Sequence, residues 1–280
     1  MLRRPHMRVR MRMRVHPPHF SINRMIPNIL TLLALCAGMT GIRFAIVGKY
    51  ETAVTAIIVA GILDGLDGRI ARLLKGTSSF GAQLDSLSDF VSFGVAPAVM
   101  LYIWTMSQLQ GFGWATVLIF AVCCGLRLAR FNTQIGAERP PYAYNFFTGV
   151  PAPAGAGLVI IPMIASFEFG NEFFRSPYLN LIVIAAVAAL MVSRVPTFAA
   201  KRFHVPHEYV LPLLLLVGAL AAFLTTEPWL TLLVVGAGYI GSIPLSIRSY
   251  GRLKRAADEM RSATLRVVSE AGAQAGTAER

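Results

Sequence analysis

Two neighbouring apolar runs, TAVTAIIVAGILDGLDGRIARLL (52–74) and AQLDSLSDFVSFGVAPAVMLYIW (82–104), decide the fold of this chain. Each run is long enough to cross a bilayer as a helix, which takes about 20 residues. Because a membrane span must satisfy its own backbone hydrogen bonds, both runs are expected to be helical. Six further apolar stretches of comparable length occur at 26–48, 112–132, 148–168, 178–195, 208–225 and 229–248. The sequence therefore predicts an all-α polytopic integral membrane helical bundle of about eight transmembrane helices.

The composition agrees with a membrane protein. Hydrophobic residues make up 55% of the chain and charged residues 14%, whereas soluble domains carry about 25% charged residues. The net charge of +12 and the arginine-rich start could also indicate nucleic-acid binding. Basic residues collect on the cytoplasmic flanks of membrane spans, however, and this explains the charge without a nucleic-acid partner.

The distribution of basic residues predicts the orientation of the spans. With the spans placed as above, all of the 26 Lys and Arg residues fall on one side except Arg43, Lys49 and Arg175. The positive-inside rule then places that side, with both termini, in the cytoplasm. This arrangement requires an even number of spans, as the eight apolar stretches provide.

The tails and one irregular segment complete the predicted organisation. Residues 1–25 form a basic N-terminal arm with a short interfacial helix, and residues 26–248 form the transmembrane domain. Residues 249–280 form a cytoplasmic amphipathic helix on the membrane surface, which ends in a frayed tail. The segment GVPAPAGAG (149–157) is rich in Pro and Gly. We expect it to break or kink the start of the fifth span.

Four of the five aspartates of the chain lie within the two opening runs: Asp64, Asp67, Asp85 and Asp89. Their i, i+3 and i, i+4 spacings place each pair on one helix face. The short polar link between the runs brings the pairs together, and four carboxylates at low dielectric would repel one another unless a cation lay between them. Carboxylate ligands suit Mg²⁺, Mn²⁺ or Ca²⁺ rather than zinc. Ionisable groups inside spans are usually functional, so we predict a divalent-metal site.

Residues beside the aspartates indicate the ligand. Gly68, Ala71 and Gly81 are small and permit close approach of a bulky group to the backbone. Arg72 can pair with a phosphate. A metal and an arginine beside small residues would suit a pyrophosphate, although small residues also serve simply to pack membrane helices.

The complete pattern resembles the signature of the CDP-alcohol phosphotransferases, at Asp64, Asp67, Gly68, Ala71, Arg72, Gly81, Asp85 and Asp89. The resemblance implies that the first three aspartates bind the metal and that Asp89 both approaches the metal and acts as the base. It also implies that Gly68, Arg72 and Ser78 contact the CDP moiety. The P-N-x-x-T element of the family is matched by Pro27, Asn28 and Thr31, where the first span would meet the nucleotide. The predicted CDP-lipid contacts are therefore Asn28, Thr31, Gly68, Ala71, Arg72, Ser78 and Gly81.

Four longer stretches resemble the branch of this family formed by the membrane-embedded phosphatidylserine synthases: 27–42, 85–98, RLARFNT (127–133) and 146–157. This resemblance implies transfer of the phosphatidyl group from CDP-diacylglycerol to L-serine with release of CMP. It also implies a homodimer. The positive-inside orientation predicts that the active site lies near the cytoplasmic face of the inner cell membrane.

The acceptor would contact the end of the fourth span, where Arg127, Arg130 and Asn132 are level with the aspartates. One of these arginines could receive the serine carboxylate; alternatively, both are ordinary positive-inside anchors. Two other functions stay open at this point. The acceptor could be glycerol 3-phosphate, an inositol compound or choline, or the aspartates could line the path of a divalent-cation transporter. Transporter sites usually lie at the bilayer midplane, whereas these aspartates lie towards one end of their spans.

Overall fold

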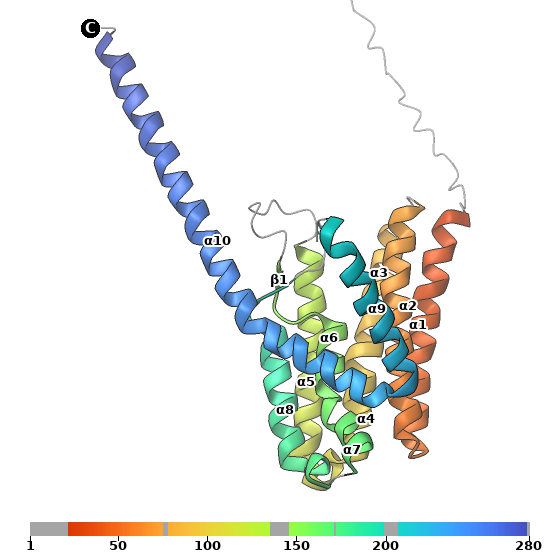
Figure 1. Cartoon of the computed structure of the whole chain (residues 1–280). Helices are drawn as coiled ribbons and strands as arrows, with labels where there is room; N and C mark the ends of the chain where they lie inside the picture. Colours follow the sequence, from red (N-terminus) through yellow and green to blue (C-terminus); the bar gives the residue numbers. More distant parts are fainter. Residues whose placement is uncertain (1–21, 75–77, 135–145, 171, 199–206, 279–280) are drawn as a thin grey trace, which may run out of the picture.

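The computed structural model describes residues 22–74, 78–134, 146–170, 172–198 and 207–278. Most of the predicted basic arm lies outside these residues. The described chain is almost entirely helical (Figure 1), in the order α1 (Ile22–Ile46), α2 (Tyr50–Leu73), α3 (Ser79–Asp89), the π-helix η1 (Phe90–Val95), α4 (Ala96–Trp104), η2 (Met106–Leu109), α5 (Gln110–Thr133), β1 (Phe146–Thr148), α6 (Ala152–Val159), α7 (Ile161–Phe169), η4 (Glu172–Arg175), α8 (Pro177–Val192), β2 (Pro196–Phe198), η5 (His207–Tyr209), α9 (Val210–Thr226) and α10 (Pro228–Ala278).

The helices form a membrane bundle, as the apolar runs predicted. Among the described residues, five helical stretches are long and apolar enough to cross a bilayer: Met25–Ile46, Ser79–Trp104, Met106–Thr133, Ala152–Phe169 and Pro228–Met260. The helices α8 and α9 are apolar but shorter. The remaining predicted span is α2, which is long enough but carries Asp64, Asp67, Arg69 and Arg72 near its end. A count of eight spans stays a prediction.

Two short strands depart from the all-α expectation. β1 and β2 pair antiparallel, with Phe146 opposite Phe198 and Thr148 opposite Pro196. Gly149 directly follows β1 and has a φ of +78°, a conformation that favours glycine. A Cβ atom there would lie 2.7 Å from the carbonyl oxygen of Met191, so a side chain is excluded. The chain thus turns sharply before it enters the bundle.

The expected irregularity of the fifth span is present, but it occurs at two places. The helix begins only at Ala152, after the turn at Gly149. A second break separates α6 from α7 at Ile160, just before Pro162. Proline has no backbone N–H to donate, which explains a break at this point.

Small residues allow the first two helices to pack closely. Ala45 on α1 and Ala53 and Ala60 on α2 are fully buried, and a Cβ atom at Gly41 would lie 3.2 Å from the carbonyl oxygen of Ala53. Close approach of helix backbones through small residues is typical of membrane interfaces. This contact fixes α1 beside the half of α2 that precedes the aspartates.

The last helix is a single element from Pro228 to Ala278 and extends well beyond the bundle (Figure 1). Residues 250–268, predicted to be an amphipathic helix, continue it without interruption. Their location on the membrane surface stays a prediction. In contrast to α8, which buries five residues, α9 buries none.

Candidate active site

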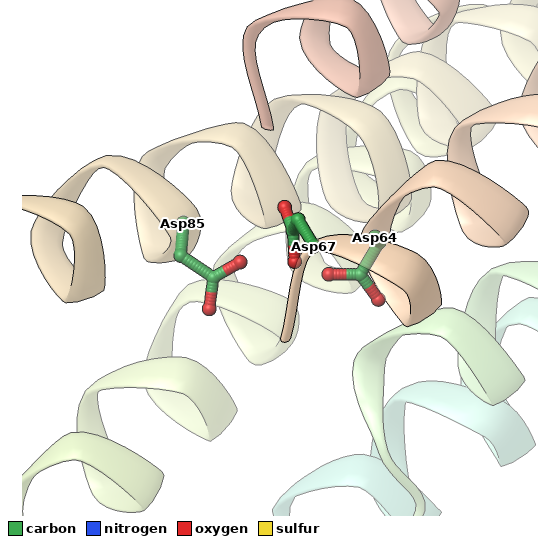
Figure 2. Close-up of side chains that lie close together, drawn as sticks. All are labelled: Asp64, Asp67 and Asp85. Atoms are coloured by element: carbon green, nitrogen blue, oxygen red, sulfur yellow. The ribbon is translucent and has the colours of Figure 1, made fainter. Parts of the chain in front are cut away.

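Three carboxylates from the C-terminal half of α2 and from α3 lie close together (Figure 2). Asp64 and Asp67 project from α2 and Asp85 from α3, and each offers an oxygen atom within 4.8 Å of the others. Asp67 is buried, with 4% of its surface exposed. A set made only of carboxylate oxygens fits a hard divalent cation such as Mg²⁺, Mn²⁺ or Ca²⁺. The structure therefore brings together three of the four aspartates at separations compatible with binding one metal ion.

Asp89 lies beside this group rather than within it. Its carboxyl group is within hydrogen-bonding reach of Asp64 and is partly buried. The π-helix η1 begins at the next residue, Phe90. Single π-turns inside longer helices are frequent at functional sites, and the sequence pattern did not predict this one. The role of Asp89 as the base stays a prediction.

Thr31 on α1 contacts the carboxylate cluster directly. Its buried hydroxyl donates to Oδ2 of Asp67 at 2.6 Å and also lies 3.0 Å from the carbonyl oxygen of Pro27. The sequence placed Thr31 among the CDP contacts, and the structure gives it this additional partner. A neighbour that donates to a metal-binding carboxylate fixes the orientation of that carboxylate.

Two serines connect α3 and η1 to α1 through hydrogen bonds. The sequence pattern did not predict these contacts. The Ser88 hydroxyl donates to the carbonyl oxygen of Thr31 at 3.0 Å, and the Ser92 hydroxyl donates to that of Ala34 at 3.2 Å. Both serines are buried. Their i, i+4 spacing inside an apolar run is a signal that could have revealed them. These bonds keep Asp85 and Asp89 level with the aspartates of α2.

We expect Thr31→Val to weaken activation by divalent metal about tenfold, because loss of an outer-shell hydrogen bond typically costs 10–100-fold in metal affinity or activity. The measurement is the Mg²⁺ or Mn²⁺ concentration that gives half-maximal activity. Thr40→Val is a matched control, since Thr40 lies on the same helix and its hydroxyl donates only to Cys36 within that helix. An equal shift in both variants would contradict an orienting role for Thr31.

A pocket of about 190 Å³ opens beside the carboxylates. Its lining comes from the first three helices and the residue before α3: Pro27, Asn28, Thr31, Asp67, Gly68, Ala71, Ser78, Gly81, Ala82 and Asp85. Every predicted CDP-lipid contact except Arg72 is among them. Arg72 is exposed, and its Nε donates to the carbonyl oxygen of Gly68 at 3.0 Å. Two carboxylates of the cluster thus form part of the wall of the predicted nucleotide pocket.

Gly81 leaves room for the side chain of Asn28 in this pocket. A Cβ atom at Gly81 would lie 2.9 Å from Oδ1 of Asn28 and 3.1 Å from Oγ of Ser78. The Ser78 hydroxyl is already fixed, because it caps α3 by accepting from the Gly81 N–H at 3.0 Å. An added methyl group must therefore displace Asn28.

We expect Gly81→Ala to raise the KM for the CDP-linked lipid about fivefold, the effect of losing roughly one hydrogen bond. The KM for the acceptor should stay the same. Gly218→Ala in α9 controls for the helix-stabilising effect of alanine, since a Cβ atom at Gly218 meets nothing within 4 Å. An unchanged lipid KM in Gly81→Ala would show that Asn28 does not contact the nucleotide.

The predicted acceptor residues lie at the end of α5, and they have different hydrogen-bond partners in the structure. Arg127 is buried, and its Nε donates to the carbonyl oxygen of Val150 at 3.0 Å. Asn132 donates from Nδ2 to the Ser86 hydroxyl at 2.8 Å, which places it against α3. Asn132 therefore faces the helix that carries Asp85, and Arg127 faces the turn before α6.

Arg130 forms hydrogen bonds with a different part of the chain. Its guanidinium donates to the carbonyl oxygens of Val192 at 2.9 Å and Ser193 at 3.3 Å. These carbonyls belong to the C-terminal end of α8, where a positive charge is favourable. Arg130 therefore contacts the end of α8, and its predicted role in acceptor binding stays a prediction.

Comparison with known proteins agrees with this geometry. Residues 24–195 match the family model described as CDP-alcohol phosphatidyltransferase, and residues 208–244 match that of CDP-alcohol phosphatidyltransferase 2. The chain is 39% identical over 227 residues to a CDP-diacylglycerol–serine O-phosphatidyltransferase of Mycobacterium bovis, covering 81% of this chain and 79% of the relative.

Two more distant relatives are similar over a shorter part of the chain. A CDP-diacylglycerol–serine O-phosphatidyltransferase of Helicobacter pylori is 33% identical, covering 64% of this chain and 75% of the relative. An archaetidylserine synthase of Methanothermobacter thermautotrophicus is 34% identical, covering 61% of this chain and 68% of the relative. The family match spans the described carboxylate cluster and the pocket beside it, and the chain belongs to the CDP-alcohol phosphatidyltransferase family.

Proposed function

We propose that this protein transfers the phosphatidyl group of CDP-diacylglycerol to the hydroxyl group of L-serine and releases CMP. The observation that carries this proposal is the pocket beside the carboxylates, whose wall includes the predicted CDP contacts together with Asp67 and Asp85. The relatives named as serine phosphatidyltransferases, which match most of the chain, support serine as the acceptor.

The proposed reaction is a direct in-line displacement at the β-phosphorus of CDP-diacylglycerol. Asp89 accepts the proton of the serine hydroxyl as its oxygen attacks. A new bond forms between this oxygen and the β-phosphorus, and the bond from the β-phosphorus to the bridging oxygen breaks. The electron pair of the broken bond stays with CMP. Phosphatidylserine is the other product, and no covalent enzyme intermediate is needed.

The aspartates divide into two roles in this scheme. Asp64, Asp67 and Asp85 would hold the divalent ion, Mg²⁺ or Mn²⁺, and this ion when bound would neutralise the charge that develops on the leaving phosphate. Thr31 orients Asp67 for this purpose through its 2.6 Å hydrogen bond. Asp89, beside Asp64, stays available for the proton.

The acceptor would lie on the α5 side of the aspartates. Cys124 is on α5 one turn before Arg127 and is within electrostatic range of both Asp89 and Arg127. We therefore assign the serine carboxylate to Arg127 rather than to Arg130, whose guanidinium contacts the end of α8.

The membrane arrangement follows from the same proposal. Eight helical segments would cross the inner cell membrane, with both termini and the aspartates on the cytoplasmic side, where CDP-linked lipid and serine are present. The basic residues concentrated on that side support this orientation. The family resemblance further implies a homodimer, and the basic end of α10 would then follow the cytoplasmic membrane surface.

The experiment that tests the function is an acceptor comparison with purified protein in detergent. CDP-diacylglycerol and Mn²⁺ or Mg²⁺ are supplied with serine, glycerol 3-phosphate, inositol or choline, and CMP release is measured. We expect release only with serine. Release with a different acceptor would reassign the substrate, and no release with any acceptor would contradict transferase activity.

A further inference from the structure

The π-helix η1 changes which side of its helical stretch faces the bundle. A π-turn holds about one residue more than an α-helical turn, so the residues after it are rotated by about 100° relative to an uninterrupted α-helix. In an uninterrupted helix, the buried face of α4 would lie about 90° away from the face that carries Asp85 and Asp89, and the π-turn removes most of this difference. The buried residues of α4 are Ala96, Pro97, Ala98, Met100, Leu101 and Trp104. The π-turn thus lets the aspartates and the apolar core of one helical stretch face the same way.

η1 is in direct backbone contact with α1 at Ser92. This serine is fully buried, and its hydroxyl donates to the carbonyl oxygen of Ala34 at 3.2 Å. Gly38, one helical turn further along α1, provides the space for this contact. A Cβ atom at Gly38 would lie 2.5 Å from Oγ and 2.8 Å from Cα of Ser92, which is too close for van der Waals contact. The close approach of η1 to α1 therefore requires a glycine at this position.

η1 also packs against α5 with little free space. A Cβ atom at Gly94 would lie 3.1 Å from Sγ of Cys124, and a Cβ atom at Gly125 would lie 3.2 Å from the ring of Phe90. The π-helix is thus in contact with α1 through Ser92 and with α5 through Phe90 and Gly94. Because both neighbours are close, η1 can adopt a different conformation only if the surrounding helices also move.

Asp89 is the residue most directly affected by the position of η1. It lies between the two serines whose hydroxyls donate to α1, Ser88 to the carbonyl oxygen of Thr31 and Ser92 to that of Ala34. The residues of α3 that line the predicted nucleotide pocket all come earlier in the helix than Asp89. A displacement of η1 would therefore change the direction of the Asp89 carboxylate before it changed the pocket.

We propose that Gly38 and Ser92 are positioning residues for proton transfer. The contact between them holds η1 in the π conformation and thereby directs the Asp89 carboxylate towards the acceptor hydroxyl. Both residues act through Asp89 and contact no substrate themselves. This inference rests on the proposed function, in which Asp89 accepts the proton of the acceptor.

Gly38→Ala tests this role because its methyl group forces η1 away from α1. To restore ordinary contact η1 must retreat by up to about 1 Å, and we expect kcat for serine-dependent CMP release to fall about 10²-fold, the effect of a misplacement of this size. The KM for CDP-diacylglycerol should be unchanged. The affinity for Mn²⁺, measured by electron paramagnetic resonance, should also be unchanged, because its predicted ligands on α2 and α3 all precede Asp89. A residue with a merely structural role would not separate kcat from both binding constants in this way.

Ser92→Ala is a milder variant that introduces no clash. It removes the hydrogen bond to Ala34, and we expect kcat to fall about fivefold, the effect of losing roughly one hydrogen bond. This variant decides the question if Gly38→Ala does not fold. The two substitutions alter one contact, so their effects should not add, and kcat of the double variant should be no lower than that of Gly38→Ala alone.

Two variants serve as controls. Gly61→Ala adds a methyl group on α2 that would make an ordinary contact of 3.8 Å with the Phe93 ring of η1. It therefore makes the same substitution next to the same π-helix without displacing it. Ser166→Ala removes a hydroxyl that donates to the carbonyl oxygen of Met163 within α7. Both variants should keep the wild-type kcat.

The outcomes separate this inference from the proposed function. If the wild-type enzyme releases CMP with serine and Ser92→Ala and Gly38→Ala both keep its kcat, the inference alone is overturned. Parallel losses in kcat, lipid KM and Mn²⁺ affinity would also overturn it, because they would indicate that the whole site has moved. A wild-type enzyme inactive with serine would contradict the proposed function and this inference with it.

Discussion

Asp89→Asn is expected to lower kcat for serine-dependent CMP release by about 10²- to 10⁴-fold, the usual contribution of a positioned general base. The amide has nearly the shape of the carboxylate but cannot accept the serine proton. The KM for CDP-diacylglycerol should change little, because Asp89 lies outside the lining of the pocket that contains the predicted nucleotide contacts. Single-turnover measurement of CMP release with and without serine would separate the chemical step from lipid binding.

The fifth aspartate of the chain offers a matched control for this variant. Asp258 is exposed on the long extension of α10, far along the chain from the carboxylate cluster. Asp258→Asn makes the same change of charge and should retain wild-type activity. If Asp89→Asn raises the KM for CDP-diacylglycerol and leaves kcat unchanged, Asp89 contributes to substrate or metal binding and is not the proton acceptor.

Removal of divalent metal is expected to abolish the activity, and Mg²⁺ or Mn²⁺ should restore it. Without a cation, the carboxylates of Asp64, Asp67 and Asp85 would repel one another at their mutual distances of less than 4.8 Å. The leaving phosphate would also lose the charge that stabilises it. The measurement is CMP release after treatment with a chelator, followed by titration of each metal.

Binding of Mn²⁺ gives a readout of the same site that does not depend on activity. Electron paramagnetic resonance of the purified protein should detect bound Mn²⁺ in the wild type, and Asp85→Asn should weaken the binding by at least about tenfold, since one of three charged ligands is neutralised. Asp258→Asn should bind Mn²⁺ as the wild type does. Undiminished Mn²⁺ binding by Asp85→Asn would show that the metal is held elsewhere.

Several features of the site followed from sequence because they depend on local geometry. The i, i+3 spacing of Asp64 and Asp67 places both carboxylates on one face of any helix that contains them. The short link before Ser79 keeps the start of α3 close to the end of α2. Residues with this regular spacing were therefore found together in the structure. The acidic composition of the cluster likewise indicates a metal ion.

Other features depend on contacts between distant parts of the chain. The hydrogen bond from Thr31 to Asp67 spans 36 residues and the one from Ser88 to the backbone of Thr31 spans 57. No local pattern specifies such pairs, because hydroxyl groups inside membrane helices also bond within their own helix, as Thr40 does. The pairing of β1 with β2 was missed for the same reason, since each strand is only three residues long.

The sequence by itself determined the class of fold, the carboxylate cluster and the family. Hydropathy and helical periodicity depend on residues that are close together in the chain, and both can be read directly from the amino-acid sequence. Only the tertiary structure decided how the two arginines of α5 differ, with Arg127 buried and hydrogen-bonded to the backbone of Val150 and Arg130 bound to the end of α8. The physical reason is that both arginines lie in the same short segment, and their surroundings depend on which helices pack against each face of α5.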